Sequence, residues 1–326
     1  MKAIIPVAGR GKRLRPHTHT NPKAMLHVAG KPIIGHILDQ LVELGIREVV
    51  MVVGYRGEMI KKYVTENYDF KTSFVNQEKL LGLGHAILST KDVVIDGPGL
   101  IVLGDTIFEA DLRPILDSTE ALIGVRRVSD PRRFGIAEVE DDRIVRLVEK
   151  PDEPTSNLAL VGIYYLPDMA PLYGALSDLL AADKRTKGEF QLTDALQVLL
   201  DRGTIMCTLE VDGWLDCGKP ETLIATNREL LQDHIHHREI LGSIIVDPVY
   251  IDDSATILDS IIGPNVSIGK DAHIERSILQ DTIVNQGSTV CGAALDKSII
   301  GEDAAFTGLL TRLNIGDTSE IEFTSM

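Results

Sequence analysis

The segment from Lys2 to Lys31 constrains the fold more than any other part of this chain. It begins with a short apolar run, Ala3–Val7, of the kind that forms a strand buried on both faces. Gly9 and Gly11 follow at once, and such glycines let backbone N–H groups approach a ligand closely. The next residues include four cations, Lys12, Arg13, Arg15 and Lys23. A strand that leads into a cationic glycine turn predicts a site for a polyanion, and a phosphate chain fits best.

Two common phosphate-binding loops do not fit this segment. A P-loop requires GxxxxGK[ST], and here Lys12 is followed by Arg13. The dinucleotide fingerprint requires a third glycine, and position 14 is leucine. The alternative without function is a glycine-rich surface turn whose charges are solvated.

Strands and helices alternate after this segment. We expect helices at 32–44, 58–67 and 84–90, and strands at 48–53, 71–76 and 99–103. From this alternation we predict a doubly wound parallel sheet, in which ligands bind at the carboxyl ends of the strands. The glycine loop, Gln77 and Asp105 all follow strands, so they converge on one edge.

Gln77 and Asp105 each have a functional and a structural interpretation. The amide of Gln77 offers a donor and an acceptor, as reading a nucleobase edge requires, and Gly82 and Gly84 allow backbone to pack on a flat base. An ordinary strand-to-helix loop is the alternative. Asp105 is a carboxylate at the end of a buried strand, and its structural interpretation is a helix cap.

Composition limits the class of protein. The chain has 326 residues, which suggests two domains, and 44% of them are hydrophobic. Lys plus Arg number 33 against 48 for Asp plus Glu, a net charge of −15, which argues against nucleic-acid or membrane-surface binding. We expect no signal peptide and no membrane span. The three cysteines form no CxxC pair, so we expect a cytoplasmic protein.

The texture of the sequence changes near Arg238. A helix is expected from about Pro220 to that residue, and its histidines His234, His236 and His237 are better explained as solvated than as metal ligands. From Ser243 onwards, aliphatic residues such as Ile251 and Ile257, or Ile268 and Ile274, lie six residues apart. We expect a six-residue period and therefore a β-solenoid.

Several motifs together resemble the sugar-phosphate nucleotidyltransferase family. The first segment is similar to the family signature G-x-G-T-R-L-x-P-x-T…P-K-x-[ML]-L-P-V-x-G-K-P, from which it departs at Lys12 and His27. The long-type glucose-1-phosphate thymidylyltransferases match best, through LVEKPDEPTSNLALVGIYYL, GEFQLTDALQ and DGWLDCGKPETL. The repeat resembles the hexapeptide left-handed β-helix. The resemblance implies a Rossmann-like, doubly wound mixed-sheet catalytic domain over 1–238 and a C-terminal left-handed β-helix over 239–326.

The resemblance also implies roles for individual residues. Arg13 would stabilise the triphosphate and the leaving pyrophosphate, and Lys23, with Lys150, would hold the sugar phosphate. The nucleotide would be bound by Ala8, Gly9, Gly11, Gln77 and Gly82. The sugar phosphate would be bound by Gly135, Glu149, Lys150 and Gly162. Asp105 and Asp216 would hold Mg²⁺, a hard cation suited to two carboxylates plus substrate oxygens. Thr193 and Asp194 are interpreted as helix-capping residues, and Cys217 as a packing residue.

The implied reaction joins a pyrimidine nucleoside triphosphate and a hexose 1-phosphate into a nucleoside diphosphate sugar, releasing pyrophosphate. dTTP and glucose 1-phosphate are favoured, and a UTP-dependent uridylyltransferase for glucose or N-acetylglucosamine 1-phosphate is the alternative. A catalytically silent regulatory or assembly subunit is a rival, although Arg13, Lys23, Asp105 and Asp216 are all present. A solenoid acyltransferase is disfavoured because His273 is the only histidine of the repeat. We expect a homo-oligomer that forms through the β-helix or the catalytic domain.

Overall fold

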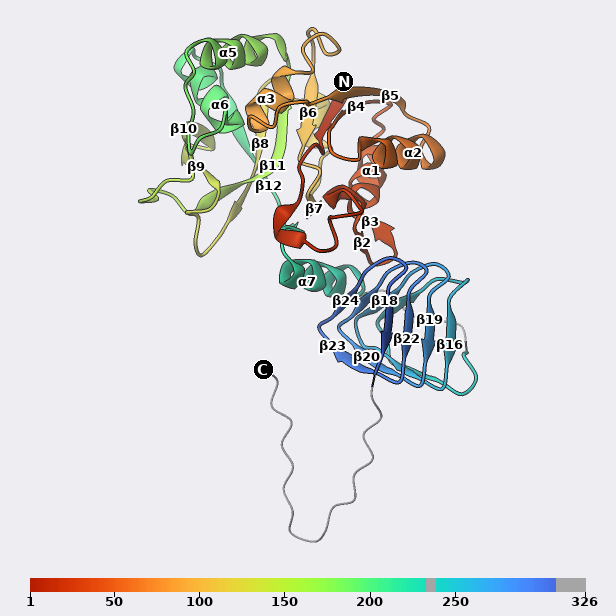
Figure 1. Cartoon of the computed structure of the whole chain (residues 1–326). Coiled ribbons are helices and arrows are strands. Elements are labelled where there is room, and N and C mark those ends of the chain that lie inside the picture. Colours follow the sequence, from red (N-terminus) through yellow and green to blue (C-terminus); the bar gives the residue numbers. More distant parts are fainter. Residues whose placement is uncertain (233–238, 309–326) are drawn as a thin grey trace. The chain divides into compact units, whose positions relative to one another are not determined.

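The computed structural model describes residues 1–232 and 239–308. It divides into two compact units, Met1–Thr226 and Asn227–Met326 (Figure 1). Each unit has a hydrophobic core of its own. The domain boundary predicted after residue 238 and the histidines His234, His236 and His237 lie outside the described residues.

The first unit is built on a nine-stranded sheet. In space its strand order is β5-β4-β1-β6-β11-β8-β12-β10-β9. The strands are β1 (Lys2–Pro6), β4 (Glu48–Val53), β5 (Lys71–Asn76), β6 (Gly99–Val102), β8 (Ala121–Arg127), β9 (Gly135–Glu140), β10 (Arg143–Glu149), β11 (Leu158–Leu166) and β12 (Met206–Glu210). The strands predicted at 48–53 and 71–76 are confirmed, and the one predicted at 99–103 ends one residue earlier.

The sheet is mixed, as the resemblance implies, whereas strand–helix alternation alone predicts a parallel sheet. Strands β5, β4, β1 and β6 are parallel to one another. Strand β11 is antiparallel to β6 and β8, whereas β12 is parallel to β8. Strands β9 and β10 are also antiparallel, and they are joined by a tight turn at Asp141 and Asp142, both with positive φ. Such a hairpin needs no crossover helix, so the alternation ends there.

Helices cover both faces of this sheet (Figure 1). Helices α1 (Ile33–Glu43) and α2 (Gly57–Asn67) lie on one side, and α3 (Leu83–Leu88), α5 (Ala170–Ala181) and α6 (Leu192–Asp201) on the other. Successive residues of β1 point to opposite faces, so Ile4 belongs to the core under α3, α5 and α6. Its neighbours Ala3 and Ile5 are buried on the other face. The strand is thus buried on both faces, as predicted.

A small sheet and several short elements complete the first unit. Strands β7 (Thr106–Glu109) and β13 (Gly213–Asp216) pair in antiparallel fashion, and β2 (His27–Val28) pairs with β3 (Lys31–Pro32). Short 3-10 helices occupy Lys12–Leu14 and Lys23–Met25, and α4 spans Pro114–Asp117. The pairing of β7 with β13 is the feature that matters most for the site, because Asp105 and Asp216 lie at its end.

The second unit contains three four-stranded parallel sheets, whose strands follow one another around a series of coils (Figure 1). This arrangement fits the predicted β-solenoid. The first sheet comprises β14 (Ile244–Ile245), β17 (Ile261–Ile262), β20 (Ile278–Gln280) and β23 (Ala294–Asp296). The second comprises β15 (Val249–Ile251), β18 (Val266–Ile268), β21 (Ile283–Val284) and β24 (Ile299–Ile300). The third comprises β16 (Thr256–Leu258), β19 (His273–Glu275), β22 (Thr289–Cys291) and β25 (Ala305–Thr307).

The period of the solenoid differs from the six residues expected. Ile257 pairs with Ile274, 17 residues on, and Ile274 pairs with Val290, 16 residues on. The true repeat is therefore the coil of three strands, and unequal turns between strands break the six-residue spacing. Inward-pointing residues of the short strands, such as Ile257, Ile274 and Val290, form the core of the unit.

Helix α7 (Pro220–Leu230) ends before the described residues do, so the helix expected to continue to Arg238 is confirmed only in its first part. Its residues from Asn227 onwards belong to the second unit, and two of them form side-chain hydrogen bonds there. Asn227 accepts a hydrogen bond from Ser267, and Arg228 donates to the buried Asp281, to which Asn265 also donates.

No helix within the described ranges combines the length and the apolar character that crossing a bilayer requires.

Candidate active site

The glycine loop follows β1 directly, and close packing of backbone shapes it. Gly104, which follows β6, lies against Val7 and Pro6 so tightly that a β-carbon would collide with Val7. A β-carbon at Gly54 would likewise be crowded, because it would lie 3.0 Å from Ala8. Gly9 has open space where a side chain would project. The loop is thereby held at the carboxyl edge of the parallel strands, where the sequence predicts a ligand site.

Lys23 and Asp105 meet at this edge. The Lys23 ammonium lies 2.8 Å from Oδ2 of Asp105, and the two side chains are 11% and 50% exposed. Lys23 reaches this position because it follows the loop, and Asp105 because it follows β6. A buried cation and a half-exposed carboxylate are therefore adjacent, in a place that the sequence assigns to phosphate and metal respectively.

A cavity of about 400 Å³ opens beside this pair. Its lining includes four of the five residues predicted to bind nucleotide, Ala8, Gly9, Gln77 and Gly82. Lys23 and Asp105 also line it. We call it the smaller cavity.

Gln77 is 6% exposed, and its amide nitrogen is bonded to other residues of the loop that follows β5. That nitrogen donates to the carbonyl of Gly82 at 3.3 Å and lies 3.1 Å from Nδ1 of His85. The amide oxygen has no hydrogen-bond partner among the residues that the structure describes. Gly82 has φ +117°, and a β-carbon there would lie 2.5 Å from the carbonyl oxygen of Phe190, so only glycine fits.

Strand pairing brings the second predicted metal ligand to the first. Asp216 is opposite Thr106 in the β7–β13 pair, so it lies beside Asp105 although 111 residues separate them in the sequence. One oxygen of Asp216 accepts a hydrogen bond from the backbone N–H of Gly218 at 2.8 Å. Two carboxylates at one strand end supply hard oxygen ligands, and the chemistry of this donor set fits Mg²⁺.

A second cavity, of about 680 Å³, adjoins the first, because Asp105, Leu83, Leu103 and Glu189 line both. We call it the larger cavity. Its lining includes the predicted sugar-phosphate residues Gly135, Glu149 and Lys150, and also Arg13 and Asp216. Asp105 is thus the predicted site residue that faces both cavities.

Glu149 is the most constrained acid of the larger cavity. Its side chain is 8% exposed, Oε1 lies 2.9 Å from the Lys150 ammonium, and Oε2 accepts a hydrogen bond from Thr193 at 2.7 Å. Gly135 is its partner across β9 and β10, and a β-carbon there would lie 3.0 Å from Oε2 of Glu149 and 2.8 Å from Leu160. The glycine therefore makes room for the carboxylate.

Thr193 does not have the capping role predicted for it. It lies within the first turn of α6, whose N-terminal cap residue is Gln191, and no side-chain cap is present. The hydroxyl bonds Glu149 instead, because a threonine that faces a buried carboxylate gains a stronger, charge-assisted hydrogen bond. Asp194 lies in the same turn, and burial raises the pKa of its carboxyl group.

Two predicted site residues line neither cavity. Gly11 has φ +59°, and a β-carbon there would lie 3.0 Å from the side chains of Lys23 and Thr18, so it shapes the loop behind Lys23. Gly162 has φ +90° and packs against Leu103. Lys23 and Lys150, predicted to hold the same phosphate, line different cavities. Arg13 lines the larger one, on the side of Asp216.

Comparison with known proteins finds similarity over the part of the chain that contains the two cavities. A family model described as nucleotidyl transferase matches residues 2–233, the stretch that contains every residue lining the two cavities. The chain belongs to the sugar-phosphate nucleotidyltransferase family. This nucleotidyltransferase is 32% identical to the low-salt glycan biosynthesis nucleotidyltransferase Agl11 of Haloferax volcanii, covering 99% of the chain and 100% of that protein. It is 30% identical to a glucose-1-phosphate thymidylyltransferase of Streptomyces antibioticus over the whole of both chains.

A solved structure is similar as well. It is described as UDP-glucose pyrophosphorylase complexed with UDP-glucose, and it superposes with a TM-score of 0.63 at 26% identity. The superposition covers 70% of the nucleotidyltransferase and 97% of that chain. This similarity supports the α/β fold of the catalytic unit.

The structure also adds residues that sequence reasoning missed. Trp214, the one tryptophan of the nucleotidyltransferase, lines the larger cavity and meets Phe134 edge-on with ring centroids 4.6 Å apart. Arg133 lines the same cavity and, like Arg13, forms no ion pair with any described residue. Its sequence context, a charged loop before Phe134, gives no signal that separates it from ordinary solvated charge.

Cys217, next to Asp216, is a packing residue, as predicted. It is fully buried, and its thiol lies 3.8 Å from the hydroxyl of Thr226. Burial raises the pKa of the thiol to about 12. The protonated thiol is a poor nucleophile, so Cys217 supports the position of Asp216 and supplies no reactive group.

Proposed function

We propose that this nucleotidyltransferase joins a pyrimidine nucleoside triphosphate, with dTTP favoured, to a hexose 1-phosphate, with glucose 1-phosphate favoured. A phosphate oxygen of the sugar phosphate attacks the α-phosphorus of the nucleotide, and the bond to the β-phosphate breaks to release pyrophosphate. The observation that carries this proposal is the pair of adjoining cavities, one lined by four of the predicted nucleotide residues and the other by three of the predicted sugar-phosphate residues, with Asp105 lining both.

The smaller cavity would take the nucleotide. Backbone at Ala8 and Gly9 offers donors to the phosphates, and the largely buried Gln77 lines the same cavity. Because the Gln77 amide nitrogen is engaged by Gly82, its oxygen is available as an acceptor. Thymine and uracil carry an N–H at position 3 that fits such an acceptor, whereas cytosine lacks it. This supports dTTP or UTP over CTP.

The larger cavity would take the hexose 1-phosphate. Glu149 offers a carboxylate to sugar hydroxyls, and Trp214 offers an aromatic wall of the kind on which sugar rings pack. Lys150 and Arg13 are cations on the same cavity wall. The sugar phosphate would bridge from there to Lys23 past Asp105, where the cavities meet.

The protein's part in such a reaction is to align two anions and neutralise charge that grows on the leaving pyrophosphate. We infer that Asp105 and Asp216 hold Mg²⁺, which when bound supplies positive charge and a template for phosphate oxygens. Arg13 and Lys23 would add fixed positive charge near the transferred group, with no covalent intermediate on the protein.

A pyrophosphate-release assay tests the proposal. The full chain is supplied with Mg²⁺ and with each of dTTP, UTP, ATP, CTP and GTP against glucose, galactose and N-acetylglucosamine 1-phosphates. We expect the highest kcat/KM with dTTP and glucose 1-phosphate. Release that is independent of the sugar phosphate, or no release with any pair, would count against a transferase.

A UTP-dependent transferase is the second candidate, because the superposed structure is described as a UDP-glucose pyrophosphorylase. Thymine and uracil differ by one methyl group, worth about 1–3 kcal/mol in an apolar pocket, so measurable turnover with both is expected. Dominance of UTP would replace the first candidate with this one. A well-folded protein that binds both substrates without turnover would instead support the silent regulatory subunit.

A further inference from the structure

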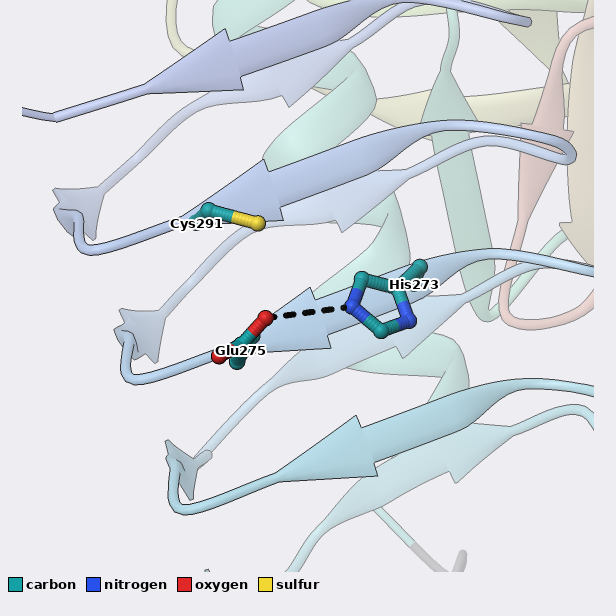
Figure 2. Close-up of side chains that lie close together, drawn as sticks. All are labelled: His273, Glu275 and Cys291. Atoms are coloured by element: carbon teal, nitrogen blue, oxygen red, sulfur yellow. Dashed lines mark ion pairs between the residues drawn. The ribbon is translucent and has the colours of Figure 1, made fainter.

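The outer face of one solenoid sheet carries a cluster of side chains that the transferase reaction does not use. His273 and Glu275 lie on β19, and Cys291 lies on the neighbouring strand β22 (Figure 2). Their potential ligand atoms, a ring nitrogen, a carboxylate oxygen and the thiol sulfur, all lie within 4.8 Å of one another. Within the described ranges, this is the only set of three His, Cys, Asp or Glu side chains so closely grouped.

Strand geometry explains why these residues share a face. His273 and Glu275 are two positions apart on β19, with the fully buried Ile274 between them, so both point outward. Glu275 pairs with Cys291 across the parallel strands, and neighbouring strands lie about 4.8 Å apart. A strand spacing and a two-residue step thus place the three groups at three corners of a four-sided patch.

The fourth corner and the surrounding positions are small or neutral. Thr289, the partner of His273, occupies the fourth corner. The outward positions on the flanking strands of this sheet are Thr256 and Leu258 on one side and Ala305 and Thr307 on the other. The neighbouring outward positions of this sheet therefore carry no charged side chain and no further His, Cys, Asp or Glu.

Two contacts already orient the cluster. Nε2 of His273 lies 3.5 Å from Oε2 of Glu275, within the ligand-to-ligand spacing of about 3–4 Å that a tetrahedral ion with bonds near 2.0–2.3 Å imposes. Arg276 lies 3.1 Å from the other oxygen, Oε1, and so fixes the carboxylate with Oε2 toward the histidine. The groups are 37% and 31% exposed, which leaves a path for an ion from solvent.

We propose that His273, Glu275 and Cys291 form a binding site for a borderline transition-metal ion, with Zn²⁺ the best fit. Imidazole, thiolate and carboxylate together match zinc, whereas magnesium and calcium prefer oxygen alone. Three protein ligands leave one coordination position for water or an exogenous group. The ion would be bound by residues of two successive coils, so its binding would stabilise the solenoid.

Cobalt substitution of the full-length protein tests the site directly. After treatment with a chelator, one equivalent of Co²⁺ is expected to produce a thiolate-to-cobalt charge-transfer band in the near ultraviolet. Zn²⁺ should abolish the band by competition. The readout requires a cysteine ligand, so binding of either ion to Asp105 and Asp216 does not contribute to it.

Variants decide which residues are responsible. Cys291→Ser should remove the band, and His273→Gln or Glu275→Gln should weaken Zn²⁺ affinity by about tenfold or more, a scale that even outer-shell changes reach. Cys207→Ser is the matched control, because Cys207 is a partly exposed free thiol bonded to Glu120 in the other unit. Replacing His234, His236 and His237 by Gln is the control for metal binding by that group of histidines. Both controls should retain the band.

Hydrogen exchange gives a second readout that does not depend on the thiol's spectrum. Zn²⁺ should slow amide exchange in peptides covering β19 and β22 of the wild type and leave the Cys291→Ser protein unchanged. Absence of the charge-transfer band in the wild type, its persistence in Cys291→Ser, or its loss in Cys207→Ser would each overturn the proposal.

Discussion

The Lys23 ammonium lies 2.8 Å from Oδ2 of Asp105, so the loop after β1 and the loop after β6 are joined by an ion pair. The two groups are expected to serve different partners, phosphate for Lys23 and a metal ion for Asp105. Binding of both would separate the pair, and each group would exchange one opposite charge for another. With these roles, Lys23 would balance the charge of Asp105 until the substrates bind.

This arrangement predicts that Lys23 and Arg13 fail differently. Lys23→Ala should raise the apparent KM for hexose 1-phosphate about tenfold or more and also lower kcat, because the attacking phosphate loses a contact. Arg13→Ala should lower mainly kcat, since charge on the departing pyrophosphate grows in the transition state. Steady-state kinetics with each substrate varied will distinguish them. A change confined to the nucleotide KM in Lys23→Ala would show that the assigned roles are wrong.

The two carboxylates at the end of the β7–β13 pair should both be required. We expect Asp105→Asn and Asp216→Asn each to reduce the Mg²⁺-dependent rate by about 100-fold or more, because metal charge stabilisation is worth several kcal/mol. Asp111→Asn is the control, since Asp111 is an exposed acid of the same unit paired with Arg113. Circular dichroism should show the same fold for all three. Wild-type rates in either site variant would remove that residue from the metal site.

The single tryptophan offers an optical test of the larger cavity. Trp214 lines that cavity, so glucose 1-phosphate should change the intrinsic fluorescence in a saturable manner. Trp214→Phe should abolish the signal and raise the KM for hexose 1-phosphate severalfold, because one aromatic wall is reduced in area. Free glucose should act only at much higher concentration. Saturation by the nucleotide alone, with no response to the sugar phosphate, would reverse the assignment of the cavities.

The sequence predicted much of this site because strand ends and glycine turns are local features. The run Ala3–Val7, the turn at Gly9 and the acid at Asp105 each carry a signal within a few residues. The meeting of Asp105 with Asp216 depends on the pairing of β7 with β13, which no local pattern encodes. Thr193 illustrates the same limit, because its partner Glu149 comes from a strand 44 residues away.

The solenoid was predicted in kind but not in period. Inward aliphatic residues such as Ile257 and Ile274 are visible in the sequence, whereas the length of each turn is set by packing between coils. Residues that lie on the outer face, including His273 and Cys291, become neighbours only once the coil length is known. Their proximity therefore could not be read from spacing.

The buried Asp281 predicts an acid-sensitive solenoid. Burial alone would raise the pKa of this carboxyl group, but hydrogen bonds from Arg228 and Asn265 outweigh it, so the pKa is lowered. A lowered pKa in the folded state contributes stability above the unfolded value, about 3.9, and this stability is lost as pH falls through the folded pKa. Asp281→Asn should cost about 1–3 kcal/mol near neutral pH and flatten this acid dependence.

Hydrogen exchange of peptides from residues 244–307 measures that effect in the solenoid alone. Asp271→Asn serves as the control, because Asp271 is exposed in the same unit. It should behave as the wild type at every pH. Equal acid sensitivity of Asp281→Asn and the wild type would show that the Arg228–Asp281 pair is not responsible.

The last prediction concerns separation of catalysis from assembly. All residues lining the two cavities lie before residue 217, and none comes from the solenoid. A chain shortened to end at Arg238 should therefore keep nucleotidyl transfer within about tenfold of the full chain, a loss of 1.4 kcal/mol at most in transition-state stabilisation. It would, however, leave Asn227 and Arg228 without Ser267 and Asp281, and it would remove the β-helix, one of the two regions through which a homo-oligomer is expected to form. We expect a smaller oligomer or a less soluble protein.

Light scattering, run beside the pyrophosphate assay, tests this prediction. An unchanged oligomer mass would exclude an assembly role for the solenoid. A folded but inactive truncation would mean instead that the solenoid helps to hold the catalytic carboxylates in place.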